Sequence, residues 1–173
     1  KINGENRLWE IPTKKSANAN EYTWEYSFDV ESSSDTNPSI PKLSDGNYEF
    51  NIEVNDKAGK KATSQKSIIV DTKKPSLTVV SDFDYNLEDK KIIFSDEKPN
   101  HTIIGTSTDS GSGVAKVQYV INQNDSVIED SEWKAATGVE EWTRSIDIAS
   151  LSDGQWYLHL RSIDNAAKIS DIT

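Results

Sequence analysis

The stretch LSDGNYEFNIEVNDKAG, residues 43–59, decides the fold class of this chain. From Tyr48 to Val54, aromatic and aliphatic residues alternate with polar residues, which is the period of two expected of a strand with one buried and one wet face. Turn-forming residues flank this strand, with Asp45-Gly46 before it and Asp56-Lys57-Ala58-Gly59 after it. The stretch therefore predicts a β-strand bounded by two turns.

The same pattern recurs 108 residues later. Leu151-Ser152-Asp153-Gly154 repeats the first turn, and Asp164-Asn165-Ala166 repeats the second. Between them, Trp156, Leu158 and Leu160 keep the phase of the strand. Two separate matches at one offset indicate an internal repeat, and a period near 100 residues suits an array of whole domains.

Other segments also read as short strands separated by clusters of turn residues, with no helical stripe between them. This pattern predicts an all-β fold built of antiparallel β-sandwiches in tandem. The further predicted strands are Ser67–Asp71, Ser76–Val80, Lys91–Phe94, Thr102–Thr106, Ala115–Ile121 and Arg144–Ile148.

The junction between the two modules is predicted at Asp71–Pro75, where a proline and two lysines interrupt strand pairing. This gives a first module over residues 1–70, a linker over residues 71–75 and a second module over residues 76–173. Compared with the 108-residue period, the first module lacks its first strands and the second stops before its last strand. We therefore expect the chain to be a segment of a longer array.

The motifs resemble those of the bacterial immunoglobulin-like repeats of large surface proteins and adhesins. The resemblance rests on Leu43–Tyr48, on Asp56–Gly59, on the linker pattern Val70-Asp71-Thr72-x-x-Pro75 and on Gly105–Val114, which looks like the opening hairpin of the family. It implies tandem immunoglobulin-like β-sandwiches, with neighbouring modules of the same chain as partners. It is nearly silent on the ligand, because this fold hosts many roles.

The resemblance also assigns structural roles to residues around the repeated strand. Tyr48, after Gly46, stands where immunoglobulin folds place a tyrosine corner, and Phe50 occupies the place of a core cysteine. Trp156, after Gly154, stands at the tyrosine position of the second module, which puts a hydroxyl-mediated corner there in doubt. A further departure is Ala167, which replaces Gly59 and puts in doubt a turn with positive φ.

Composition excludes several classes of function. The chain has 173 residues and a net charge of -10, with 29 acidic residues against 19 basic ones. Such a charge disfavours nucleic acid and anionic lipid, and no apolar run approaches the length of a membrane helix. The absence of cysteine excludes disulfides and thiolate chemistry, and the absence of methionine indicates a processed or partial chain. We expect an extracellular or cell-surface location.

Nothing in the sequence selects an enzyme site. His101 and His159 are the only histidines, and neither belongs to a catalytic or zinc motif. We expect both to face solvent or to be satisfied structurally. The Asp109–Gly113 loop imitates a phosphate-binding loop but lacks the following lysine and helix, so a hairpin turn is expected there.

Calcium is the cofactor that the sequence favours most. Residues from Asp71 onward carry 18 acidic residues against 10 basic ones, and aspartates stand at strand ends, where hard oxygen ligands suit Ca²⁺. In the resembled family some arrays stiffen their joints in this way, and the linker aspartate maps onto Asp71. The alternative is that these aspartates bond only to their own turns. The candidate ligands are Asp71, Asp109, Asp56 and Asp164.

Two further features have structural explanations. The acidic run at residues 82–89 fails as a calcium loop, because Leu87 stands where the sharp turn needs glycine and Ile93 where a glutamate should close the site. With gaps, Trp9 and Trp24 align with Trp133 and Trp142, and recurrence in both modules favours core packing over a sugar-stacking platform.

These observations predict non-catalytic repeat modules of a bacterial cell-surface or secreted protein, acting as spacers or adhesion units. Their external partner would be a host or cell-surface protein or a glycan. The alternative is an accessory carbohydrate-binding module of a secreted carbohydrate-active enzyme. An exposed coplanar pair of tryptophans would favour that alternative, whereas buried tryptophans would count against it.

Overall fold

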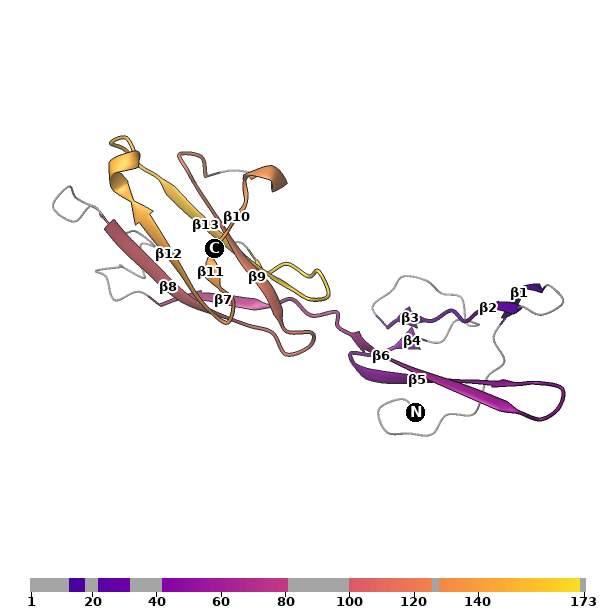
Figure 1. The fold of residues 1–173 in the computed structure, drawn as a ribbon. Coiled ribbons are helices and arrows are strands. Elements are labelled where there is room, and N and C mark those ends of the chain that lie inside the picture. The colour runs from indigo at the N-terminus through magenta and orange to yellow at the C-terminus, as the bar shows by residue number, and fades with distance from the viewer. Residues whose placement is uncertain (1–12, 18–21, 32–41, 81–99, 126–127, 172–173) are drawn as a thin grey trace. The chain divides into compact units, whose positions relative to one another are not determined.

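The computed structural model describes residues 13–17, 22–31, 42–80, 100–125 and 128–171 (Figure 1). These residues form strands, turns and loops, with two single-turn 3-10 helices, η1 (Asp130–Glu132) and η2 (Ile148–Ser150). The predicted all-β class is thus confirmed. The chain divides into two compact units, Lys1–Thr72 and Lys73–Thr173, which we call unit 1 and unit 2. The boundary falls inside the segment predicted as linker.

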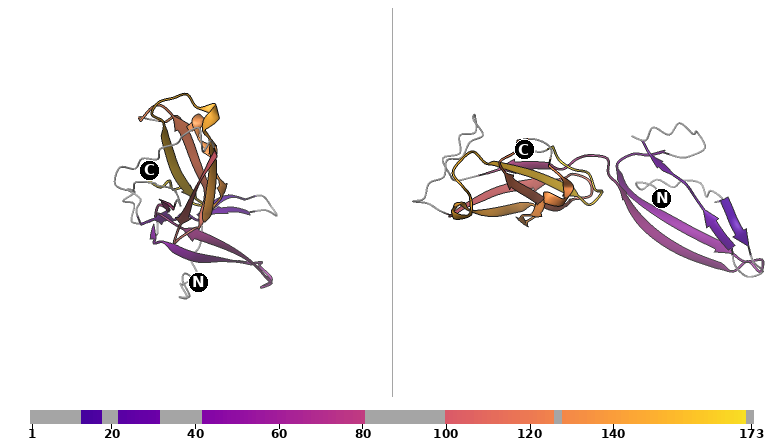
Figure 2. Two further views of the ribbon diagram at one scale, coloured as in Figure 1. Left: turned by 90° about the vertical axis from the view of Figure 1, so that its left-hand side faces the viewer. Right: turned by 90° about the horizontal axis from the view of Figure 1, so that it is seen from above.

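Unit 2 contains two antiparallel sheets, which can be followed in Figures 1 and 2. One has the strand order β11-β12-β8-β7 and the other has the order β10-β9-β13. The strands are β7 (Ser76–Val79), β8 (Asn100–Thr108), β9 (Val114–Asn122), β10 (Lys134–Ala135), β11 (Thr137–Gly138), β12 (Glu141–Asp147) and β13 (Tyr157–Asp164).

The core of unit 2 is built from alternate residues of both sheets, as the two-residue period of a strand requires. Its buried members are Ile103, Trp142 and Ile146 from one sheet and Val117, Tyr119 and Leu160 from the other. Trp142 is fully buried and lies against Gly105, the residue that faces it on β8. A Cβ atom on Gly105 would overlap the Trp142 ring, so this close approach requires glycine.

Unit 1 has less sheet in its described part. Its longest element is the antiparallel hairpin of β5 and β6, and two shorter pairs accompany it. A small core unites Leu43, Tyr48 and Val70, with Val30, Phe50 and Ile68 packed around it. The strands are β1 (Thr13–Ala17), β2 (Tyr22–Glu25), β3 (Asp29–Val30), β4 (Lys42–Leu43), β5 (Gly46–Asn55) and β6 (Lys61–Val70).

The predicted strands of the described region are present, with shifted ends. The strand predicted from Ser67 begins at Lys61, because β6 pairs with β5 along ten residues. Ile148 belongs to η2 rather than to β12, since the side chain of Asp147 accepts a hydrogen bond from the amide of Ala149 and starts a turn there. The predicted strand Lys91–Phe94 lies outside the described residues.

One predicted connection is wrong. The Asp109–Gly113 loop does not close a hairpin, because β8 and β9, which it joins, lie in different sheets. The loop is a crossing between the two layers of unit 2. The sequence showed the turn residues but carried no information on the sheet to which the next strand belongs.

Candidate functional site

The turn after β13 places Asp164 at one end of unit 2. Its Oδ1 accepts hydrogen bonds from the amides of Ala166 and Lys168, both at 2.8 Å. Ala167 completes the turn with φ of 63°, so the positive φ that the sequence left in doubt is present without glycine. The turn is the predicted one, and it holds Asp164 with only 2% of its surface exposed.

The loop after β8 places Asp109 in a similar way. Its Oδ2 accepts hydrogen bonds from the amides of Gly111 at 3.0 Å and Gly113 at 2.8 Å. As expected, Asp109 and Asp164 each accept hydrogen bonds from the backbone of their own turn. These bonds use only one of the two carboxylate oxygens of each residue.

Asn165 fastens these two turns together. Its side-chain amide donates hydrogen bonds to the carbonyls of Ser112 at 2.9 Å and Gly113 at 3.0 Å. Its backbone amide also donates to the Gly113 carbonyl at 3.0 Å, and the amide of Ala166 donates to the Ser112 hydroxyl at 3.1 Å. The positions of Asp109 and Asp164 relative to each other are thus set by a local network within unit 2.

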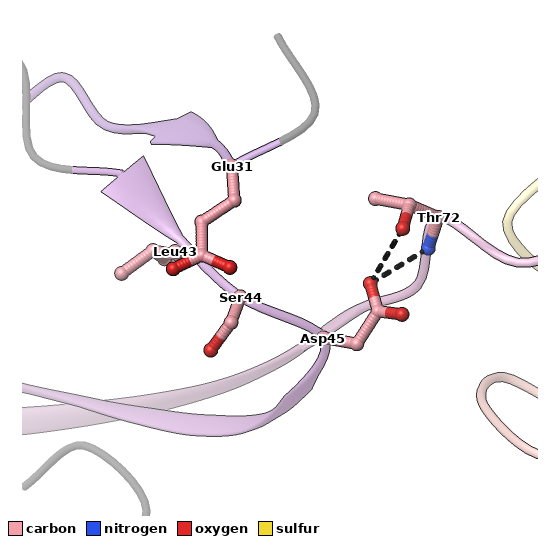
Figure 3. A pocket seen from close by; sticks show the side chains of 5 residues that line it. All are labelled: Glu31, Leu43, Ser44, Asp45 and Thr72. Atoms are coloured by element: carbon pink, nitrogen blue, oxygen red, sulfur yellow. Dashed lines mark hydrogen bonds between the residues drawn. The ribbon is translucent and has the colours of Figure 1, made fainter.

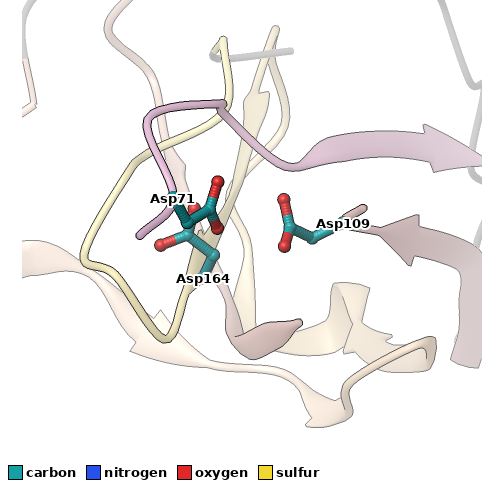
Figure 4. A group of neighbouring side chains, drawn as sticks. All are labelled: Asp71, Asp109 and Asp164. Carbon is teal, nitrogen blue, oxygen red and sulfur yellow. The ribbon is translucent and has the colours of Figure 1, made fainter. Parts of the chain in front are cut away.

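The two turns bring carboxylates of Asp109 and Asp164 together, as Figure 4 shows. One oxygen of each side chain lies within 4.8 Å of an oxygen of the other. Asp109 Oδ1 and Asp164 Oδ2 are both buried and have no hydrogen-bond partner among the described residues. The pair therefore combines two oxygens used by the turns with two oxygens that remain unsatisfied.

Electrostatics makes this arrangement costly for the bare protein. Two full negative charges 4.8 Å apart repel by about 3.5 kcal/mol at an effective dielectric constant of ~20. Buried polar atoms are normally paired, and an unpaired one calls for an explanation such as an ion. A bound cation would offset the repulsion between the carboxylates and would coordinate the unsatisfied oxygens. Carboxylate oxygens are ligands of hard divalent cations such as Ca²⁺ and Mg²⁺.

The other two candidate ligands lie in unit 1. Asp56 Oδ1 accepts hydrogen bonds from the amides of Ala58 and Lys60, both at 2.8 Å, so its turn matches that of Asp164. Unlike Asp164, Asp56 is exposed, and it joins no acidic group among the described residues. Asp71, the third residue drawn in Figure 4, is buried and directly follows β6. Its role as a ligand stays a prediction.

The predicted corner residues do share one interaction. In unit 1, the Tyr48 hydroxyl donates a hydrogen bond to the Ser44 carbonyl at 2.7 Å. In unit 2, the Trp156 indole N–H donates to the Ser152 carbonyl at 2.9 Å, four residues upstream in both cases. The doubt about Trp156 is thereby resolved, because an indole N–H replaces the hydroxyl as donor. Gly46 and Gly154 precede them with φ of 153° and 141°.

Unit 1 also has a hollow lined by Glu31, Leu43, Ser44, Asp45 and Thr72 (Figure 3). Asp45 Oδ1 accepts hydrogen bonds from the amide and the hydroxyl of Thr72, both at 2.9 Å. The repeated motif aspartate thus fastens the end of unit 1. Phe50, the predicted apolar substitute for a cysteine, stacks on Phe28 with ring centroids 5.3 Å apart.

His159 and two tryptophans of unit 2 have structural roles. His159 is 9% exposed, and its Nε2 lies 3.0 Å from the Asn124 carbonyl oxygen, so it is satisfied as expected. His101 is also buried and does not face solvent. Trp133 and Trp142 are buried, as core packing predicts, and the guanidinium of Arg161 lies 4.2 Å from the centre of the Trp133 ring.

One tryptophan contradicts its prediction. Trp24 is 45% exposed, although its alignment with Trp142 predicted core packing. Its strand β2 has only β1 as a partner among the described residues, whereas β12 is an inner strand of a four-stranded sheet. Trp9 lies outside the described residues.

Sequence reasoning missed two residues that organise these sites. The repeat predicts Asn165 only as a turn residue, although the amide side chain that replaces Lys57 at this position is a signal of a turn clamp. The sequence predicts only a turn at Asp45, and nothing in it indicates the hydrogen bond with Thr72, 27 residues away.

Comparisons with known proteins find no relative of this chain. Family models, curated proteins and solved structures were each searched, and none of the three comparisons yields a match for this chain. In the part of the chain that the structure describes, no helix has the length and apolar character to cross a bilayer. The function is therefore argued from the geometry of the two units.

Proposed function

We propose that units 1 and 2 are tandem immunoglobulin-like modules of a bacterial cell-surface or secreted protein, which act without catalysis as spacer or adhesion units. One observation carries this proposal: the two stretches with the same sequence motif make the same hydrogen bonds. Each motif has an aromatic donor bonded four residues upstream, at Tyr48 and Trp156, and an aspartate that caps the following turn, at Asp56 and Asp164.

The distribution of tryptophan supports the spacer function over glycan binding. A sugar platform needs exposed aromatic faces, and both tryptophans that the repeat alignment assigns to unit 2 are buried. The exposed Trp24 of unit 1 is the one tryptophan of the two-stranded sheet formed by β1 and β2. We therefore place adhesion, where it occurs, at strand edges or loops rather than at an aromatic platform.

Mechanical unfolding tests the spacer proposal. When the chain is pulled from both ends by atomic force microscopy, two modules in series should rupture in two separate events. The two length gains should match residues 1–72 and 73–173. A smooth extension at low force would contradict a load-bearing role, and a single rupture of the whole chain would contradict two modules.

We further propose that Asp109 and Asp164 bind Ca²⁺ as part of this function. The ion would neutralise the carboxylate pair and fasten the loop between β8 and β9 to the end of β13. The two unsatisfied oxygens of the pair support this assignment. Extracellular modules bind Ca²⁺ at about 10⁻⁴–10⁻³ M, which suits the proposed location.

Thermal unfolding of the full chain tests the ion. With 10 mM Ca²⁺ added to chelator-treated protein, dissociation constants in that range stabilise unit 2 by about 1.4–2.7 kcal/mol. The melting temperature of unit 2 should therefore rise by at least a few degrees. Asp164→Asn should abolish the rise, because asparagine keeps an oxygen for the turn but removes the charge.

Asp56→Asn is the matched control, because Asp56 caps the same turn in unit 1 and is exposed. It should leave the response to Ca²⁺ unchanged. Asp71→Asn tests the predicted ligand of the linker, and loss of the response there would add Asp71 to the site. An unchanged melting temperature in Ca²⁺, or a full response in Asp164→Asn, would contradict the proposed ion.

A further inference from the structure

Asn165 is connected to both carboxylates of the acidic pair in unit 2. It directly follows Asp164 in the chain, and its side-chain amide donates hydrogen bonds to the carbonyls of Ser112 at 2.9 Å and Gly113 at 3.0 Å. The amide of Gly113 in turn donates to Asp109 Oδ2 at 2.8 Å. One peptide bond and two hydrogen bonds thus join Asp164 to Asp109 through Asn165 and Gly113.

Charge repulsion favours separation of Asp109 from Asp164. Asp164 is 2% exposed, and its Oδ2 and the Oδ1 of Asp109 are buried without a hydrogen-bond partner among the described residues. The loop that carries Asp109 contains Gly111 and Gly113, so its backbone can adopt other conformations at little cost. The hydrogen bonds of Asn165 hold this loop against the turn after β13 and oppose the separation.

The equivalent turn of unit 1 provides a comparison. Asp56 Oδ1 accepts the same two turn hydrogen bonds, but the next residue is Lys57, which is exposed. Asp56 joins no acidic group among the described residues. The turn therefore occurs in both units, whereas the amide side chain and the carboxylate pair occur together in unit 2.

We propose that Asn165 is a positioning residue for a divalent cation, which keeps Asp109 and Asp164 close enough to bind one ion together. This inference rests on the proposed function, which assigns Ca²⁺ to the pair. Asn165 acts through the loop after β8 and not by contact with the ion. It raises the fraction of molecules in which both carboxylates are in place, and the apparent dissociation constant falls in proportion to that fraction.

Two variants, Asn165→Ala and Asn165→Asp, test this role. Both remove the side-chain donors to Ser112 and Gly113, and both keep the backbone hydrogen bond from residue 165 to the Gly113 carbonyl. Because Asn165 is exposed, neither variant opens a cavity in the core. Loss of a group that orients metal ligands typically weakens metal binding by about 10–100-fold, so both variants should raise the dissociation constant for Ca²⁺ about tenfold or more.

NMR titration of the labelled, chelator-treated full chain with Ca²⁺ measures this constant. The amides of Gly111 and Lys168 report on the site, because they donate to the carboxylates of the pair. Asn165→Asp separates position from charge, since an added negative charge alone would strengthen cation binding. Lys57→Ala is the matched control at the equivalent position of unit 1, and it should leave the dissociation constant unchanged.

Thermal melts distinguish a positioning role from a purely structural one. If Asn165 positions the pair, Asn165→Ala should lower the melting temperature of unit 2 more in 10 mM Ca²⁺ than in chelator. The reason is that weaker ion binding adds to the loss of the two hydrogen bonds. A purely structural residue would give the same loss in both conditions.

Three results would overturn the proposal. One is an equal loss of melting temperature with and without Ca²⁺, and another is Ca²⁺ binding by Asn165→Ala as tight as that of the unaltered chain. The third is equal or tighter binding by Asn165→Asp, which would make charge the determinant of affinity. An unaltered chain that binds no Ca²⁺ would contradict the proposed ion itself, so this failure is distinct from a failure of the role of Asn165 alone.

Discussion

Units 1 and 2 place the same motif in different surroundings. Ile52 and Leu160 occupy equivalent positions of the repeated strand, but Leu160 is 2% exposed between two sheets, whereas Ile52 is only partly buried. Two residues further on, Val54 is 56% exposed and Ser162 is fully buried. The more apolar side chain of this second pair is thus the more exposed one.

This comparison separates features set by residues close in sequence from features set by the packing of one sheet on another. The corner and turn hydrogen bonds are the same in both units, because they join residues at most four positions apart. Burial differs because it depends on the second layer. In unit 2 that layer is a four-stranded sheet, whereas the described part of unit 1 has only short strand pairs beside its hairpin.

The largest expected change in the free energy of unfolding comes from truncating the two equivalent aliphatic residues, Leu160 and Ile52. Leu160→Ala should lower the free energy of unfolding of unit 2 by about 2–5 kcal/mol, because it leaves a cavity in a closed core. Ile52→Ala should cost unit 1 only about 1 kcal/mol, since the residue is partly exposed. Denaturant titration of both variants measures the difference, and equal losses would show that Ile52 is as well covered as Leu160.

Periodicity and turn chemistry were sufficient to predict the elements that depend on neighbours in sequence. The strand at residues 46–55, the aspartate-capped turns and the strand starting at Ser76 all follow from alternation and turn residues. The doubts about Trp156 and Ala167 concerned side-chain identity, and both positions keep the local geometry of unit 1.

What the sequence did not predict depends on the assembly of layers. The crossing at Asp109–Gly113 looked like a hairpin, because turn residues do not record which sheet the next strand joins. Trp24 and Trp142 align, yet only Trp142 is covered by a second sheet. The pairing of Asp109 with Asp164 likewise depends on two turns 55 residues apart being clamped by Asn165.

Substitutions at the two equivalent turns should change stability by smaller amounts, with opposite signs in the two units. Gly59 has φ of 80°, so Gly59→Ala should destabilise unit 1 by about 1 kcal/mol through backbone strain alone, because a Cβ there meets no other atom. Ala167 already bears this strain, so Ala167→Gly should stabilise unit 2. The gain should be only about 0.5 kcal/mol, since glycine also increases the entropy of the unfolded chain.

Thermal melts of the two single variants measure this pair of effects. The double variant is the control, because the two changes lie in separate units and should be additive. Two shifts of the same sign would show that the turns are not equivalent, despite their matching hydrogen bonds.

The smallest expected effect is on the carboxyl pKa values of one surface ion pair in each unit, and through them on stability at low pH. In unit 2, the hydrogen bond and charge of Lys74, whose Nζ lies 2.7 Å from Asp171, hold the pKa of Asp171 below its ordinary value of 3.8. In unit 1, the pKa of Glu53 is lowered from 4.5, first by the Asn55 hydrogen bond and then by Lys61. Both depressed values add stability above the unfolded pKa, which is lost as the pH falls through the folded pKa.

Carboxyl titration by NMR distinguishes the two pairs. Lys74→Ala should return the pKa of Asp171 to its ordinary value, because the lysine supplies both lowering interactions. Lys61→Ala should return that of Glu53 only in part, since the hydrogen bond from Asn55 remains. Because the Asp171 side chain is 91% exposed, added salt should shrink the change in its pKa. A complete return at Glu53 would mean that Asn55 contributes nothing, and the two pairs would then be equivalent.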